Sequence, residues 1–101
     1  MKESTLQALT MHRDQGKPVG GFVTAVLENN LVQAICYADE DNLRDIVEIT
    51  KWVYQEMPGG AWGSPSKVRG WRDNGGAEGF YKRRLRWDAN SNRLEPILEE
   101  G

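Results

Sequence analysis

The sequence predicts a small, mainly α-helical single domain that carries a basic and aromatic C-terminal extension. Its 101 residues leave room for one small domain. Between residues 4 and 73, apolar side chains recur at spacings of three and four, and glycine or proline separates the periodic segments. Past residue 75 the period is ambiguous. We therefore expect a bundle of three to four helices in residues 1–74 and an extension, which also suits a short hairpin, in residues 75–101.

The first helix is expected over residues 4–14. Ser4 followed by Gln7 matches a capping box, in which each residue satisfies a backbone N–H at the start of a helix. Leu6 and Leu9 then lie on one side of the helix. Gly16 and Pro18 end it.

The second and third helices are expected over residues 21–38 and 42–57. The second follows the Gly20-Gly21 pair and keeps its helical period without a visible break. The third follows the acidic run 39–42, which supplies N-cap side chains and negative charge for a first turn. The sequence Pro58-Gly59-Gly60 ends it.

A short fourth helix is expected over residues 65–73, with Ser64 as N-cap and Pro65 at the first helical position, where its missing N–H costs nothing. The remainder has two readings. Phe80 and its neighbours suit a helix, whereas alternation from Tyr81 to Trp87 suits a strand followed by a turn at 90–92.

These patterns also predict which side chains form the hydrophobic core. The expected core comprises Leu6, Leu9, Phe22, Val26, Leu27, Leu31, Ile35, Leu43, Ile46, Val47, Val53, Tyr54, Val68 and Trp71.

Positive charge is concentrated in one segment. Residues 67–87 hold seven Lys and Arg and two acidic residues, whereas the rest of the chain holds six and thirteen. Aromatic side chains share the same segment. Cations with aromatic rings suit single-stranded nucleic acid, because they neutralise phosphates and stack on bases, and they also suit protein interfaces. A purely structural reading, in which the arginines cover the acidic body, stays open. The sequence pI near 5.4 argues against a dedicated DNA-binding domain.

Catalytic and metal chemistry find little support in the residue content. One histidine, His12, lies in a polar stretch, and one cysteine, Cys36, is expected to be a small buried side chain. The acidic run 39–48 lacks the spacing of a calcium loop, and helix capping explains it. The glycines punctuate helices and form no phosphate-binding loop. The sequence therefore favours a protein that is not an enzyme and binds no metal or cofactor.

The longest apolar runs fall far short of the roughly 20 residues that cross a bilayer, and residues 1–20 lack the apolar region of a signal peptide. We expect a soluble, intracellular protein without a membrane partner.

Several motifs resemble those of small accessory proteins, made early in infection and largely uncharacterised, of tailed bacteriophages. They include Lys17-Pro18-Val19-Gly20-Gly21-Phe22, the run from Ala25 to Leu31, and Trp62-Gly63-Ser64-Pro65 with Trp71. The resemblance covers about residues 6–72 and leaves the C-terminal extension outside. It implies a location in the host cytoplasm and action by binding host machinery, as the phage anti-RecBCD proteins do when they bind the host recombination nuclease.

The predicted function is thus binding and inhibition or modulation of a host protein, plausibly a DNA-processing or defence nuclease such as RecBCD. The alternative is a module that binds single-stranded nucleic acid through the basic, aromatic segment, and a homo-oligomer is a third option. Trp62 lies in a loop of small residues, 59–65, which we call the tryptophan loop; its ring either packs on the second and third helices or is exposed as an anchor for a partner. The expected partner-binding residues are Trp62, Arg72, Phe80, Tyr81, Arg83, Arg84, Arg86 and Trp87.

Overall fold

The computed structural model of the chain describes residues 1–83, 85–88 and 93–96, and the surroundings of side chains in residues 1–79. This part is mainly helical and elongated, with a longest dimension of 53 Å. Its elements are α1 (Glu3–Gln15), α2 (Gly21–Leu27), α3 (Leu31–Tyr37), α4 (Glu40–Arg44), α5 (Ile46–Glu56), α6 (Pro65–Asp73), α7 (Gly76–Arg83), β1 (Leu85–Asp88) and β2 (Arg93–Pro96).

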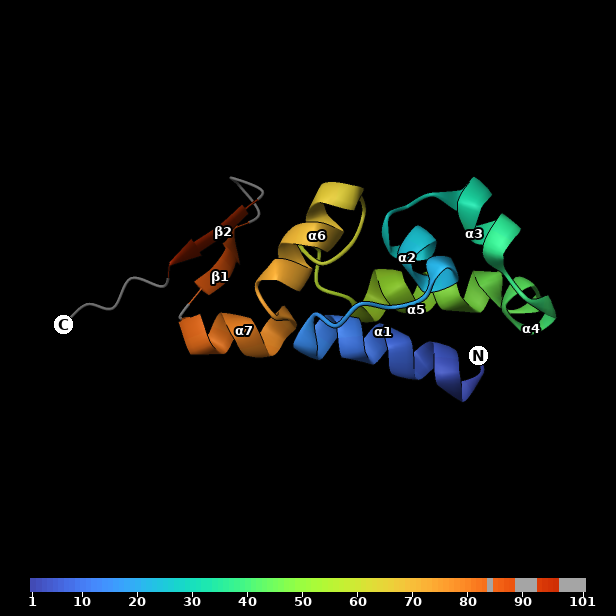
Figure 1. The fold of residues 1–101 in the computed structure, drawn as a ribbon, viewed down its shortest axis with the longest axis horizontal. Coiled ribbons are helices and arrows are strands. Elements are labelled where there is room, and N and C mark those ends of the chain that lie inside the picture. The colour runs from blue at the N-terminus through green and yellow to red at the C-terminus, as the bar shows by residue number, and fades with distance from the viewer. Residues whose placement is uncertain (84, 89–92, 97–101) are drawn as a thin grey trace.

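Helices α1 and α7 follow one another along the length of the molecule (Figure 1). The amino terminus, α3 and α4 lie toward one end, whereas α7 and the strand pair lie toward the other. Helix α6 contacts both α2 and α7. The two strands pair antiparallel, with Arg86 opposite Glu95 and Trp87 opposite Leu94.

The first helix spans nearly the expected residues, but its start is different. The helix begins at Glu3, so Ser4 lies inside it, and no side chain caps it. The carbonyl of Lys2 accepts hydrogen bonds from the N–H groups of Thr5 and Leu6 instead. The capping-box prediction is therefore wrong. The predicted end is confirmed, because Gly16 adopts the left-handed conformation with φ of 64°.

The second expected helix is divided into α2 and α3. Asn29 adopts a φ of 62°, in the left-handed region that asparagine tolerates better than most residues. The next residue, Asn30, then starts α3, and its side-chain oxygen accepts a hydrogen bond from the N–H of Gln33 at 3.2 Å. Two adjacent asparagines thus end one helix and cap the next.

The third expected helix is divided as well. The side chain of Asp39 caps α4 by accepting a hydrogen bond from the N–H of Asn42 at 2.8 Å, as the capping interpretation predicts. Asp45 then leaves helical geometry, with φ of −96° and ψ of 10°, and α5 follows directly. The expected start at residue 42 falls inside α4.

The fourth expected helix is confirmed as α6. The Ser64 hydroxyl accepts a hydrogen bond from the N–H of Lys67 at 3.3 Å, and Pro65 occupies the first turn. Its Trp71 is buried, and the indole N–H lies 3.0 Å from the carbonyl oxygens of both His12 and Arg13. This bond fixes α6 against the C-terminal end of α1.

The segment for which the sequence allows either a helix or a strand contains one of each: α7 ends at Arg83 and β1 begins at Leu85. Helix α7 packs on α1 through glycine. A Cβ atom on Gly16 would lie 2.6 Å from the backbone nitrogen of Gly76, and a Cβ on Gly76 would meet the backbone nitrogens of Gly16 and Gln15. At the turn into α7, a Cβ on Gly79 would overlap the carbonyl oxygen of Asn74. Only glycine permits backbones to approach so closely. The expected turn at residues 90–92 lies outside the described residues, and the domain boundary at residue 75 stays a prediction.

The hydrophobic core lies between α1, α2, α5 and α6. Of the expected core, Leu9, Phe22, Leu27, Val53, Val68 and Trp71 are buried, and Val26 and Ile46 are partly buried. The prediction was wrong for Leu6, Leu31, Ile35, Leu43, Val47 and Tyr54, which are exposed. Smaller or unexpected side chains take their place, namely Thr5, His12, Val23, Ala25, Ala34, Ile49, Met57 and Ala61.

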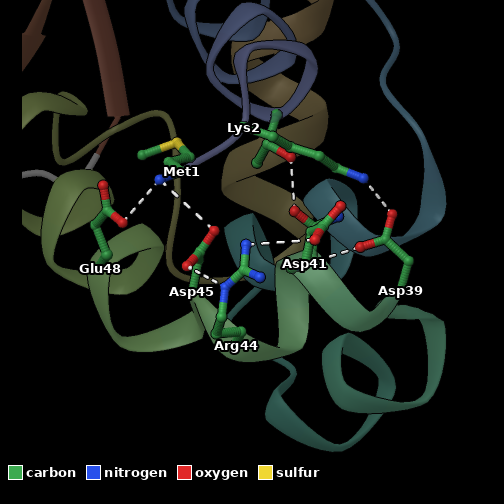
Figure 2. Close-up of polar contacts among 9 residues, drawn as sticks. Met1, Lys2, Asp39, Asp41, Arg44, Asp45 and Glu48 are labelled. Carbon is green, nitrogen blue, oxygen red and sulfur yellow. Dashed lines mark hydrogen bonds and ion pairs between the residues drawn. The ribbon is translucent and has the colours of Figure 1, made fainter.

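Polar contacts hold the amino terminus against α4 and α5 (Figure 2). The Met1 ammonium group donates to Glu48 at 2.8 Å and lies 3.6 Å from Asp45, and the Lys2 ammonium group pairs with Asp39. Inside, the Thr5 hydroxyl donates to the side-chain oxygen of buried Asn42 at 2.7 Å. These contacts place α4 and the start of α5 beside α1.

Candidate functional site

The tryptophan loop that precedes α6 is fixed at both of its sides. The carbonyl oxygen of buried Ala61 accepts a hydrogen bond from His12 Nε2 at 2.8 Å, and the N–H of Gly63 donates to the carbonyl of Leu27 at 2.7 Å. Trp62, between these anchors, packs against the core and stays partly exposed. Its ring meets that of Tyr54 edge to face, with centroids 6.5 Å apart.

Trp62 lines an apolar groove of about 220 Å³ between α2, α3 and α5. Its floor includes Val26, Ala34 and Val53, and α5 adds Ile46 and Thr50. Residues 29–31 complete the lining. None of the lining residues carries a formal charge, whereas 28% of the whole chain is charged.

Exposed apolar side chains also occur on both flanking helices, although Val47 lines a second hollow together with the charged Glu48 and Lys51. We call them the α3–α5 face: Leu31, Val32, Ile35, Val47 and Tyr54, each between 47% and 75% exposed. On α3, Leu31 and Ile35 are one turn apart and Val32 is adjacent to both; on α5, Val47 and Tyr54 are two turns apart. Four of the five were expected in the core. Their apolar spacing was therefore visible in the sequence, but these side chains are exposed and do not lie in the core.

Arg72, another expected contact residue, lies elsewhere. It lines a separate hollow of about 420 Å³ with residues of α7 and with Gln15 and Lys17. Its Nε and Nη2 atoms are buried without a hydrogen-bond partner. The structure thus places Trp62 and Arg72 on different parts of the surface.

The other expected contact residues follow Arg72 in the chain. Phe80, Tyr81 and Arg83 belong to α7, and Arg86 and Trp87 belong to β1. Arg84 lies outside the described residues. Helices α6 and α7 and the strand pair occupy the half of the molecule opposite α3 and α4 (Figure 1). The basic segment 67–87 therefore forms one end of the elongated molecule, which we call the basic end.

Histidine 12 has the environment of a core residue. The imidazole is completely buried. Because a carbonyl oxygen only accepts, Nε2 carries the hydrogen that is donated to Ala61, and Nδ1 is buried without a partner. Burial lowers the pKa of His12, and the positive charge of Arg72 lowers it further, although the bond to Ala61 acts in the opposite direction. The polar sequence around His12 gave no sign of this burial.

The structure also describes the surroundings of Cys36, possible metal-binding groups and the hydropathy of the helices. Cys36 is exposed on α3, so the prediction of a small buried side chain was wrong. In the part of the chain that the structure describes, no group of three or more His, Cys, Asp or Glu side chains is arranged to hold a metal ion. Within the same residues, no helix has both the length and the hydropathy needed to cross a bilayer.

Comparison of the chain with protein-family models, with curated proteins and with solved structures finds no match. The resemblance to phage accessory proteins stays a prediction.

Proposed function

We propose that the protein is a non-enzymatic phage accessory protein that binds a host protein through the basic end and thereby inhibits or modulates it. The observation that supports this proposal is the separation of charge along the molecule. Residues 1–66 hold five Lys and Arg and nine acidic residues, and residues 67–87 hold seven and two. The strand pair at the same end adds Arg93 and the acidic Asp88 and Glu95, so the described part of this end keeps a positive excess. Because α6, α7 and β1 lie together, the sequence asymmetry becomes an asymmetry in space.

The chemistry of the basic end fits an acidic or nucleic-acid-like surface. Arginine and aromatic side chains are the usual anchors of protein interfaces, and positive charge accelerates encounter with a negative partner. The proposed target is a host protein, such as the DNA-processing nuclease RecBCD, that offers an acidic part of its surface to the basic end, because complementary charges attract. The DNA-binding surface of such a nuclease is itself positively charged, so the contact is expected outside it. Inhibition by binding requires no catalytic group.

The test is affinity capture from a bacterial lysate treated with nuclease, followed by mass spectrometry. The test variant is Arg83→Gln with Arg86→Gln, and the control is Lys51→Glu on the exposed side of α5, which changes the net charge by the same two units at a distant place. We expect one stoichiometric host protein with the wild type and the control, and at least tenfold less with the test variant. Equal capture by all three, or no host protein, overturns the proposal.

The alternative function, binding of single-stranded nucleic acid, is favoured by the same residues and predicts a different result. Capture would then yield nucleic acid that nuclease removes. Affinity for an oligonucleotide would fall with salt, with a log–log slope of about −0.7 for each phosphate contacted. Binding that is weak and insensitive to salt excludes this alternative.

A further inference from the structure

We infer that Asn74 and Gly75, the two residues between α6 and α7, form a site of spontaneous deamidation whose product weakens the packing of α7 on the end of α1. The reaction needs no enzyme and no reactant other than water. The inference does not depend on the proposed function. Three features carry it: the sequence of this junction, its hydrogen bonds and the close approach of the backbones around it.

Glycine after asparagine removes the steric barrier to an internal reaction. Gly75 has no Cβ, so its backbone nitrogen can approach the side chain of Asn74. The nitrogen loses its proton to water and attacks the amide carbon Cγ; the bond from Cγ to Nδ2 breaks and ammonia leaves, which gives a five-membered succinimide ring. Water then opens the ring at either carbonyl and yields aspartate, or isoaspartate when the main chain continues through Cγ. Of the asparagines in the chain, Asn74 is the one that precedes glycine.

In the folded protein, the two reacting groups are held apart. Asn74 has φ of −86° and ψ of −1°, so the nitrogen of Gly75 is turned toward the backbone nitrogen of Asn74 and away from its Cβ. The Asn74 Nδ2 group donates a hydrogen bond to the carbonyl oxygen of Gly70 at 2.8 Å. The N–H of Gly75 donates to the carbonyl oxygen of Arg72 at 3.0 Å. Ring closure requires rotation about ψ and loss of the bond to Arg72, so the junction must open before it reacts.

The junction has no space for a longer main chain. A Cβ atom on Gly76 would meet the backbone nitrogen of Gly16, and a Cβ on Gly79 would overlap the carbonyl oxygen of Asn74. Isoaspartate adds one methylene group to the main chain at residue 74. Because packed backbones do not absorb an added group without moving, α7 cannot then keep its contacts with both Gly16 and residue 74.

The charge of the product acts in the same direction. Both products replace the amide that donates to Gly70 by a carboxylate, which cannot donate a hydrogen bond. The new charge lies at the C-terminal end of α6, where the helix dipole disfavours a negative group. Asn74 also lines the hollow beside α7 with two carboxylates, Asp73 and Glu78, and with the cations Lys17 and Arg72. Deamidation therefore adds a third carboxylate there and removes one unit of the positive excess of residues 67–87.

The first test compares the rate of conversion in the folded and in the unfolded chain. Purified protein is kept in mildly alkaline buffer with and without guanidinium chloride, and trypsin then releases Asn74 in the peptide 73–82. Mass spectrometry detects the exchange of NH for O, and chromatography separates aspartate from isoaspartate. We expect conversion at least about tenfold slower in the folded protein, because only the open junction reacts. The asparagines in the peptide 14–44 should stay intact over the same time. Equal rates in the two states, or no conversion of Asn74 in the unfolded chain, overturn the inference.

Two glycine variants change the junction without replacing a reacting residue. Gly79→Ala places a methyl group against the carbonyl oxygen of Asn74, whereas the matched control Gly70→Ala has nothing within 4 Å of the new methyl group and keeps the carbonyl that Asn74 bonds. We expect deamidation at least about fivefold faster in Gly79→Ala, because the overlap destabilises the closed junction, and no faster in Gly70→Ala than in the wild type. Equal rates in the two variants contradict the inference. Circular dichroism verifies folding, and the wild-type comparison decides if Gly79→Ala does not fold.

Hydrogen exchange measures the consequence for α7. Each product carries one more negative charge, so ion exchange separates it from unreacted protein. We expect the backbone amides of α7 to exchange at least about tenfold faster in the isoaspartyl product, and those of α5 to keep their wild-type rates. Asn74→Asp supplies the aspartyl product alone and should have a smaller effect. Exchange in α7 that is the same before and after conversion would refute the predicted weakening. All of these measurements use purified protein, so their failure is distinct from failure of the proposed function.

Discussion

The buried histidine predicts how stability depends on pH. Burial and the positive charge of Arg72 lower the pKa of folded His12 from its ordinary value of 6.5, against the opposing effect of the hydrogen bond to Ala61. In the unfolded chain it takes up a proton near pH 6.5. Below about pH 6.5 the unfolded state binds more protons than the folded state, so the free energy of unfolding falls as pH falls. Above that pH, His12 does not affect the pH dependence of stability.

The size of the effect follows from the linkage relation. One histidine contributes a slope of at most about 1.4 kcal/mol per pH unit, reached well below pH 6.5 and continuing until the folded imidazole itself titrates. For a domain of this size, that slope lowers the melting temperature by about 6–11 °C per pH unit. The other groups with shifted pKa values act elsewhere. Hydrogen bonds from Lys2 and Arg44 lower the pKa values of Asp39 and Asp45, so those carboxylates lose their contribution near and below pH 4.

The assay is urea denaturation at intervals between pH 7.5 and 5. His12→Gln keeps an N–H group for Ala61 and removes the titration, so it should be less stable at pH 7.5 and show a flat profile over this range. Since the chain has one histidine, the ¹⁵N shifts of its ring also report the tautomer without ambiguity. A flat wild-type profile, or the same slope in His12→Gln, would refute the reasoning.

Three further predictions concern local stability. Gly70→Ala in α6 should stabilise the protein by about 0.4–1 kcal/mol, because nothing lies within 4 Å of the new methyl group. Gly79→Ala in α7 should destabilise it by about 1–3 kcal/mol or more, because the methyl group would overlap Asn74. Urea midpoints of the two variants test this, and a stabilised Gly79→Ala protein would disprove the close approach. Asn30→Ala should cost about 1 kcal/mol by removing the cap of α3, with Asn29→Gly close to neutral as control, and equal losses at both positions would argue against the cap. The bond to Glu48 raises the pKa of the Met1 ammonium group above 8.0. The contribution of this group to folding stability is therefore present below pH 8 and is lost as pH rises through the raised pKa. Glu48→Gln should flatten the dependence of melting temperature on pH between pH 8 and 10, and an unchanged dependence would show that the ammonium group contributes nothing.

The sequence predicted helices more reliably than it predicted what they face. Gly16, Ser64 and Pro65 end or start helices where expected, because their effects are local to the backbone. The breaks at Asn29 and Asp45 were missed because apolar spacing continues through them. Asparagine's tolerance of positive φ and its capping ability were the signals that could have revealed the first break.

The environment of single residues depended on contacts between distant parts of the chain. His12 is buried because Ala61 and Arg72, about 50 and 60 residues away, close around it, and no local pattern encodes that closure. The approach of Gly16 to Gly76 is similar, since each glycine alone looks like a simple helix end. The core therefore contains small side chains such as Ala34 where the sequence pattern favoured large ones such as Leu31 and Ile35.

The α3–α5 face and the basic end occupy different halves of the molecule. Substitutions on one surface should therefore not change the free energy of binding at the other by more than about 0.5 kcal/mol, the usual limit for independent sites. Leu31→Glu with Val47→Glu should therefore leave capture of the host protein unchanged, whereas Arg83→Gln with Arg86→Gln should lower it. Equal losses of capture in both variants would show that the two surfaces are not independent.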